Sequence, residues 1–254
     1  MNQLFWADLC KKEFKMAGHS HWAGIKHKKG RQDNLRSKIF SKISREITVA
    51  AKLGSKDPDT NHRLRAAIET AKEANMPKDN ISRAINKSET DKNQNFQNLR
   101  YEGFGPKNIA VIIETLTDNK NRTAGKIRTA LQKFGGNLGA SGSTAHFFEN
   151  CGIIQIPKES ISEEKLLDFA ATTDARDCFS LEDFHEIITK KDDFYKIKSQ
   201  AGELIKNLHY SGIEWRPKSF VSLNDEEKKE IEKMLELLED DDDVQRVFHN
   251  CKFT

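Results

Sequence analysis

The spacing of apolar residues changes along the chain, and this change constrains the fold more than any other feature of the sequence. Leu35, Ile39, Ile43 and Ile47 recur every fourth residue, which places them on one face of an α-helix. Further along, apolar residues form short continuous runs such as 109–116, separated by segments with a helical period. The chain is therefore expected to be α+β, with a helical part followed by parts that mix strands and helices.

The first third of the chain predicts three helices on a basic arm. Residues 17–33 contain three glycines and no apolar period, which indicates an irregular arm. The first helix is expected to begin after an N-cap at Asn34 and to end at Gly54. The third is expected to begin near Pro77, because proline suits the first turn of a helix. The polar stretch 88–98 is expected to be a linker.

The remainder predicts short strands that alternate with helices. Residues 101–106 contain two glycines and a proline, which indicates a turn. The expected strands are 109–116, 144–148, 152–156, 220–221 and 244–248, and the expected helices are 121–134, 162–172, 192–208 and 225–238. This alternation favours α/β sandwich domains over a doubly wound nucleotide-binding fold.

The net charge of +3 conceals a strong asymmetry between the two ends of the chain. Residues 16–92 hold 17 Lys and Arg against 9 Asp and Glu, whereas residues 150–254 hold 15 against 24. A molecule with one basic and one acidic end presents a directional field to a polyanion. The basic end is therefore expected to be the docking face for nucleic acid.

The cations of the arm and of the first helix are the candidate contacts to nucleic acid. Basic side chains neutralise phosphates, and a tryptophan ring can stack on a base. The residues expected to bind are Trp22, Lys26, His27, Lys28, Lys29, Arg31, Arg36, Lys38, Lys42 and Arg45. The charge suits duplex DNA and ribosomal RNA equally, because phosphate contacts carry no sequence information. A solvated face of a helical domain would carry the same residues.

The sequence offers little support for catalysis, a metal or a cofactor. His19, His21 and His27 match no common zinc spacing and have no cysteine or carboxylate that completes a set. The glycine-rich loop 135–142 lacks the pattern of a phosphate-binding loop. The acidic run 239–243 follows a helix and is expected to be a solvated turn. We therefore expect no enzyme activity, no cofactor, no metal and no small-molecule substrate.

The chain is expected to be cytoplasmic and to have no membrane partner. No run approaches the roughly 18 apolar residues that a membrane-spanning helix needs. Four scattered cysteines are expected to be free thiols. Residues 1–15 lack the features of a secretory signal and are interpreted as an N-terminal extension, with Met16 as the expected start of the main part.

Several longer segments resemble those of the YebC/PmpR family, in the order in which the family has them. They are MAGHSHW at 16–22, IKHKK at 25–29, KIFSK at 38–42, EITVAA at 46–51, ANMPKDNI at 74–81, YEGFGP at 101–106, LTDNKNRT at 116–123, GGNLG at 135–139 and DDVQRVFHN at 242–250. Residues 161–209 fit only in general pattern. The extension at 1–15 and His21, where lysine is common, depart from the family.

The resemblance implies three domains, a helical bundle followed by two α/β sandwich domains of which the middle one is discontinuous. The expected boundaries are 16–92 for the basic helical domain, 93–149 plus 217–254 for the discontinuous domain and 150–216 for the inserted domain.

The resemblance also implies a function without catalytic residues. Bacterial members are described as DNA-binding transcriptional regulators, and a role on the ribosome is also attributed to them. Mitochondrial relatives look like translational activators of cytochrome oxidase subunit I. We expect a DNA-binding transcriptional regulatory protein, with a ribosome-associated translation factor that binds RNA as the alternative. The absence of a helix-turn-helix signature from the sequence keeps the RNA alternative open.

Overall fold

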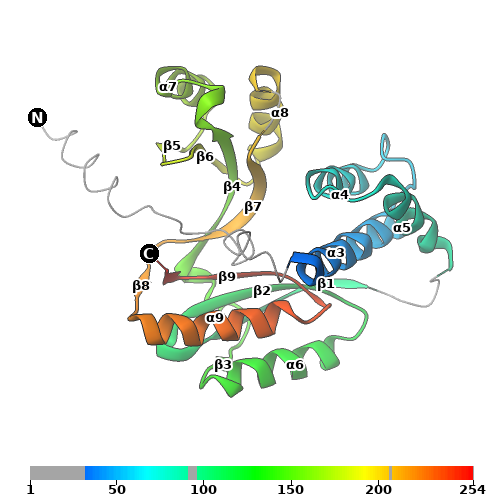
Figure 1. Ribbon diagram of the computed structural model, residues 1–254, viewed down its shortest axis with the longest axis vertical. Coiled ribbons are helices and arrows are strands. Elements are labelled where there is room, and N and C mark those ends of the chain that lie inside the picture. Colours follow the sequence, from blue (N-terminus) through cyan, green and yellow to red (C-terminus); the bar gives the residue numbers. More distant parts are fainter. Residues whose placement is uncertain (1–31, 91–95, 206–207, 254) are drawn as a thin grey trace, which may run out of the picture. The chain divides into compact units, whose positions relative to one another are not determined.

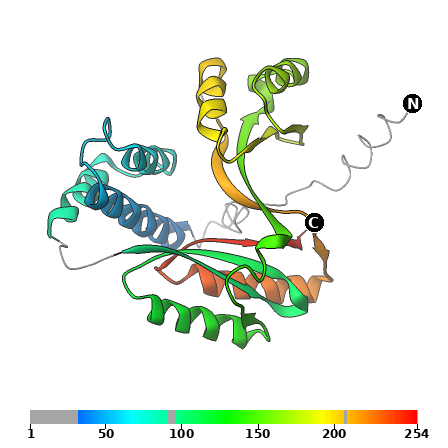
Figure 2. The same ribbon diagram turned by 180° about the vertical axis from the view of Figure 1, so that it is seen from behind.

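The computed structural model describes residues 32–90, 96–205 and 208–253 (Figures 1 and 2). Within these residues the chain forms seven α-helices, two four-stranded sheets and one two-stranded sheet. The described residues fall into two compact units. One unit contains the helical bundle and the residues up to Ser143, together with Asp225–Val247, and the other contains Thr144–Asn224 and the residues from Phe248 onward. The expected fold class, α+β, is confirmed.

The helical bundle consists of α3 (Gln32–Leu53), α4 (His62–Glu73) and α5 (Lys78–Thr90). The α4 N-cap is Asn61, whose side chain accepts from the Leu64 amide at 3.1 Å. The expected end of the first helix at Gly54 is confirmed, but the expected N-cap at Asn34 is wrong because α3 begins at Gln32. A periodic pattern marks the buried part of a helix, and α3 continues beyond that part toward its N-terminus.

The bundle buries the apolar face that the four-residue spacing predicted. Ile47, Leu64 and Ile81 lie in one core cluster, one from each helix. The Thr48 hydroxyl donates to the Ala84 carbonyl at 2.8 Å and so joins α3 to α5. Burial of these aliphatic side chains stabilises the bundle by about 1.5–3 kcal/mol for each fully buried residue.

The first four-stranded sheet has the order β3–β1–β2–β9. Its strands are β1 (Gln97–Phe104), β2 (Ala110–Thr117), β3 (Asn137–Leu138) and β9 (Val244–His249). The short 3-10 helix η1 (Pro106–Asn108) connects β1 to β2, which pair antiparallel. Helices α6 (Lys120–Lys133) and α9 (Asp225–Glu239) lie on one face of this sheet (Figures 1 and 2). This sheet brings distant parts of the chain together, because β9 lies beside β2, which precedes it by more than a hundred residues.

The turn expected at 101–106 is wrong, because β1 continues to Phe104. Gly103 pairs with Val111 on one side and Leu138 on the other. A Cβ at Gly103 would lie 2.6 Å from the Asn137 carbonyl oxygen, so glycine is required here for close packing of strands rather than for a turn.

The second four-stranded sheet has the order β5–β6–β4–β7, with antiparallel neighbours throughout. Its elements are β4 (Phe148–Pro157), β5 (Asp177–Ser180), β6 (Phe184–Lys190) and β7 (Tyr210–Pro217), with α7 (Glu163–Thr172) and α8 (Phe194–Leu204). Ile154 and Ile187 are paired across the sheet and share a core cluster with residues of both helices. The short strands β8 (Val221–Ser222) and β10 (Cys251–Lys252) pair in parallel.

Two further expectations about this part of the chain are corrected. The strand expected at 144–148 is mostly the 3-10 helix η2 (Ala145–Phe147), and β4 is one continuous strand that begins at Phe148. The helix expected at 192–208 ends at Leu204, because Ile205 has an extended backbone. The expected domain boundaries stay predictions.

Candidate nucleic-acid interface

Three cations of α3 lie against the acidic turn, the segment Glu239–Asp243 at and after the end of α9. Lys38 forms an ion pair with Asp240, and Lys42 donates to the main-chain oxygen of Glu239 at 2.8 Å. The two lysines are four positions apart in the sequence, so they share one side of α3. They meet the C-terminal end of α9, where unpaired carbonyls and the helix dipole favour positive charge.

Arg45 continues this row toward the C-terminus of α3 and makes three hydrogen bonds. Its guanidinium donates to the Leu116 carbonyl at 3.2 Å and to the Asp242 carbonyl at 2.7 Å. It also pairs with the Asp243 carboxylate at 2.8 Å. Arg45 therefore connects α3 to the end of β2 and to the acidic turn.

Asp243 is the centre of these contacts. Besides Arg45, its carboxylate accepts from Arg122 at 2.9 Å, from Thr123 at 2.8 Å and from Thr117 at 3.2 Å. Burial by itself would raise the pKa of this carboxyl. The hydrogen bonds from Arg122, Thr123 and Arg45 outweigh burial, so its pKa lies below the usual value. Asp243 therefore stays ionised and holds two arginines from distant parts of the chain.

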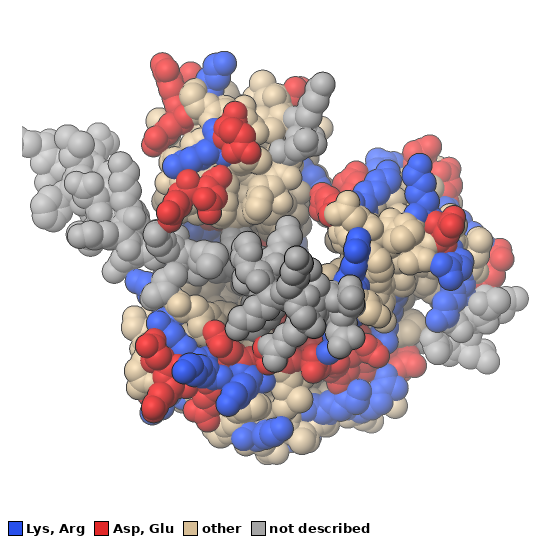
Figure 3. Space-filling view, in the orientation of Figure 1, with Lys and Arg blue, Asp and Glu red and all other residues tan. Residues whose placement is uncertain are grey.

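The expectation of a solvated acidic run is wrong for part of the acidic turn. Glu239 and Asp243 are buried, whereas Asp240 and Asp242 are exposed. Figure 3 shows acidic side chains gathered at the end of α9, with basic side chains of α6 next to them. The cations of α3 and α6 make burial possible here, because a buried carboxylate is tolerated only when it is paired.

The remaining described residues of the predicted set differ in their surroundings. Arg36 is exposed, and its guanidinium lies 5.6 Å from the ring centre of Phe40. Burial lowers the pKa of Lys42, and the charges of Glu239 and Asp242 oppose that shift. Lys38, Lys42 and Arg45 thus have partners within the protein, whereas Arg36 faces solvent. Their binding of nucleic acid stays a prediction.

The other predicted contacts lie outside the described residues. They are Trp22, Lys26, His27, Lys28, Lys29 and Arg31.

A polar cleft of about 650 Å³ lies beside the Asp243 contacts. We call it the basic cleft, because four cations and two carboxylates line it. Its lining residues are Ser41, Ser44, Arg45 and Thr48 of α3, Asn80, Arg83, Ala84 and Lys87 of α5, Phe96, Asp118, Arg122 of α6, and Asp243. The cleft therefore has the size of a small-ligand site and an excess of positive charge.

Arg83, Lys87 and Arg122 were not among the site residues predicted from the sequence. They belong to no dense run of cations, and their side chains meet only in the folded chain. The spacing of Arg83 and Lys87, four residues apart on a helix, was the available signal.

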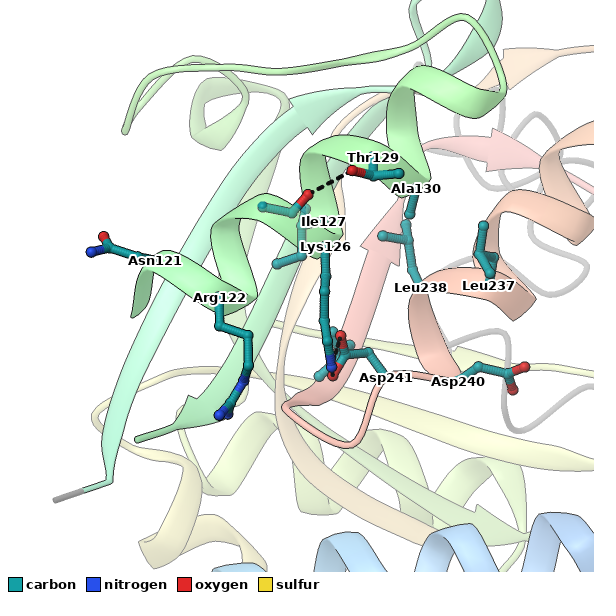
Figure 4. Close-up of a pocket in the computed structure, with 12 residues that line it drawn as sticks. Asn121, Arg122, Lys126, Ile127, Thr129, Ala130, Leu237, Leu238, Asp240 and Asp241 are labelled. Atoms are coloured by element: carbon teal, nitrogen blue, oxygen red, sulfur yellow. Dashed lines mark hydrogen bonds and ion pairs between the residues drawn. The ribbon is translucent and has the colours of Figure 1, made fainter. Parts of the chain in front are cut away.

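A second hollow of about 570 Å³ lies between α6 and α9. Figure 4 shows Lys126 extending to Asp241, with Ile127, Ala130 and Leu238 nearby. Because aliphatic side chains form much of its wall, this hollow offers fewer groups for a phosphate than the basic cleft does.

Other kinds of site have little support among the described residues. No group of three or more His, Cys, Asp or Glu within them is placed to hold a metal ion. None of their helices is long and apolar enough to cross a membrane. Cys151, Cys178 and Cys251 are free thiols, and burial raises the pKa of Cys151 to about 11. Its thiolate is therefore a minor form at neutral pH.

The helical bundle, the two four-stranded sheets and the basic cleft define a multidomain α+β protein with a charged, open site. Residues 20–91 match the TACO1/YebC protein N-terminal domain, and residues 96–251 match the TACO1/YebC second and third domain. The chain belongs to the TACO1/YebC family, as the resemblance in the sequence predicted.

Individual relatives agree with this assignment over nearly the whole chain. A probable transcriptional regulatory protein of Pelagibacter ubique is 52% identical over 94% of this chain and 99% of its own length. One of Zymomonas mobilis is 46% identical over 92% of this chain and 94% of its own. The crystal structure of a conserved hypothetical protein from Aquifex aeolicus superposes with a TM-score of 0.78 at 44% identity, covering 92% of this chain and 97% of that one.

Proposed function

We propose that this protein is a DNA-binding regulator of transcription that acts without catalysis. The observation that carries the proposal is the name shared by its relatives at 46–52% identity, probable transcriptional regulatory protein. The exposed Arg36 and the cations of the basic cleft support it, because such side chains neutralise phosphates. The predicted contacts at Lys28, Lys29 and Arg31 add three cations that are close to Arg36 in the sequence.

A ribosome-associated translation factor that binds RNA is the second candidate. The cations of the basic cleft favour it as much as they favour DNA, because phosphate contacts occur on both polymers. The two candidates differ in sequence preference, since a transcriptional regulator must discriminate between base sequences and a ribosomal factor need not read duplex DNA.

The test combines a duplex-DNA binding isotherm over a salt series with co-sedimentation of the protein with ribosomes. Binding of one DNA sequence far above competitors, without co-sedimentation, supports a transcriptional regulator. Firm co-sedimentation, together with weak and sequence-independent DNA binding, supports the translation factor. Failure to bind either partner at low salt contradicts both.

Charge-reversal variants connect the result to the proposed surface. Changing Lys28, Lys29 and Arg31 to Glu is expected to weaken binding, and Arg36→Glu is expected to add to the loss. Lys72→Glu is the matched control, because Lys72 is exposed on α4 and outside the basic cleft. Equal effects of Arg36→Glu and Lys72→Glu would contradict a specific role for α3.

A further inference from the structure

The cations of the basic cleft fall into two groups. Arg45 and Arg122 pair with Asp243, and Arg122 also pairs with Asp118 at 2.7 Å. Hydrogen bonds to Asp243 and Asp118 raise the pKa of Arg122, which keeps it a cation. The charges of these four side chains balance one another.

Arg83 and Lys87 of α5 are the other two cations that line the cleft. They are exposed and lie four residues apart, so they share one side of α5 with Asn80. Arg83 donates to the Asn80 side chain and, at 3.3 Å, to the Asp79 carbonyl. Both acceptors are uncharged oxygens, one of a main-chain carbonyl and one of a side-chain amide. Two neighbouring cations with an amide beside them suit the oxygens of a phosphate group.

The cleft also contains an aromatic ring. Phe96 is half-buried, and the Arg45 guanidinium lies 5.6 Å from its ring centre. The hydroxyls of Ser41 and Ser44 line the cleft on the α3 side. Cations that track a phosphate backbone, placed beside an aromatic ring, are the combination by which proteins bind unpaired nucleic acid strands.

We propose that the basic cleft binds one segment of an unpaired nucleic acid strand, with Arg83 and Lys87 on a backbone phosphate and Phe96 against a base. This inference rests on the proposed function and names the form of nucleic acid that the site takes.

The geometry favours an unpaired strand over a duplex for two reasons. A cleft of about 650 Å³ has the volume of a small-ligand pocket, which suits a short segment of one strand rather than a duplex. In a duplex, moreover, the face of each base is covered by its stacked neighbours and cannot reach Phe96. An unpaired strand exposes its base faces and brings one phosphate for each base.

The experiment measures fluorescence anisotropy of labelled oligonucleotides with the full-length protein. Unpaired DNA, unpaired RNA and duplex DNA of one sequence are titrated over a salt series. The cleft variant is Arg83→Gln with Lys87→Gln. The matched control is Lys72→Gln with Lys78→Gln, which removes the same charge from exposed positions of the bundle outside the cleft. Phe96→Leu removes the aromatic face and keeps an apolar side chain.

The wild-type protein is expected to bind at least one unpaired strand more tightly than the duplex. The cleft variant should reduce the salt dependence, the slope of log K against log salt, by about 0.7 for each lost phosphate contact. Phe96→Leu should weaken unpaired-strand binding by about 5-fold or more. A preference for unpaired DNA or for unpaired RNA identifies the source of the strand, and either supports the inference.

Three outcomes would overturn the inference. If the cleft variant matches its control, the cleft does not bind the strand, although the proposed function stands. If the cleft variant loses duplex and unpaired binding equally, the assignment to unpaired strands is wrong. If the wild-type protein binds no nucleic acid, this inference and the proposed function fail together. Thermal melting of each variant verifies the fold, and the exposed Arg83 and Lys87 make a folded cleft variant the expected case.

Discussion

Replacement of Asp243 by asparagine tests whether this carboxylate holds the bundle against the rest of its unit. Asp243 is 3% exposed and accepts hydrogen bonds from Arg45, Arg122, Thr117 and Thr123. Asparagine keeps the size of the side chain but removes its charge. It also replaces one carboxylate oxygen, which accepts hydrogen bonds, with an amide nitrogen, which can only donate them.

The expected loss of stability is about 3 kcal/mol. Removal of one partner from a buried ion pair costs about 3–5 kcal/mol. The Arg45 and Arg122 side chains are 22% and 44% exposed, so water recovers part of their solvation and the low end of the range applies. At about 2–4 °C per kcal/mol for a protein of this size, the melting temperature should fall by about 6–12 °C.

Differential scanning calorimetry of the two proteins measures this shift. Asp240→Asn is the matched control, because Asp240 belongs to the same turn but pairs with Lys38 on the surface. Exposed pairs of this kind contribute about 0–1 kcal/mol, so the control should melt close to the wild type. If Asp243→Asn and Asp240→Asn melt at the same temperature, the buried contacts of Asp243 do not stabilise the unit as argued.

Three further predictions concern pH, charge and packing. Because folding lowers the pKa of Asp243, its contribution is present above the unfolded value of about 3.9 and is lost as pH falls through the folded pKa. The difference in melting temperature between wild type and Asp243→Asn should thus shrink below about pH 4. A difference that stays constant with pH would contradict the lowered pKa of Asp243. Asp240→Asn should tighten nucleic-acid binding at low salt by up to about 5-fold, because it frees Lys38; an anisotropy titration that shows equal affinity would refute this. Gly136→Ala should destabilise the protein by about 1–3 kcal/mol in urea unfolding, because its Cβ would lie 2.3 Å from the Phe104 carbonyl oxygen. Gly125→Ala, with nothing within 4 Å, is the control and should be neutral or stabilising.

The sequence predicted the helices well, because each has a buried side with a clear period. Spacing alone placed Ile43 and Ile47 on one face of a helix; Ile47 lies in the bundle core and Ile43 packs against it. The pattern failed where glycine had two possible roles. Gly103 suggested a turn, yet its hydrogen atom leaves room for the neighbouring strand β3.

The candidate site was harder to predict, because its contacts join distant segments. Lys42 and Glu239 are 197 residues apart, and nothing near either residue indicates the other. The acidic run consequently suggested a solvated turn, and the cations of α3 suggested a free surface. Local composition identifies such charges but does not identify their partners within the fold.

The order of these elements along the chain also determines when the charged contacts can form during synthesis, which proceeds from the N-terminus. Helix α3 is synthesised early, whereas α9, the acidic turn and β9 come last. At about 5–20 residues per second, the 197 residues between Lys42 and Glu239 take about 10–40 s to make. Throughout that interval the nascent bundle carries its cations without the carboxylates that later neutralise them. A growing chain therefore offers a more basic surface to any polyanion in reach than the finished protein does.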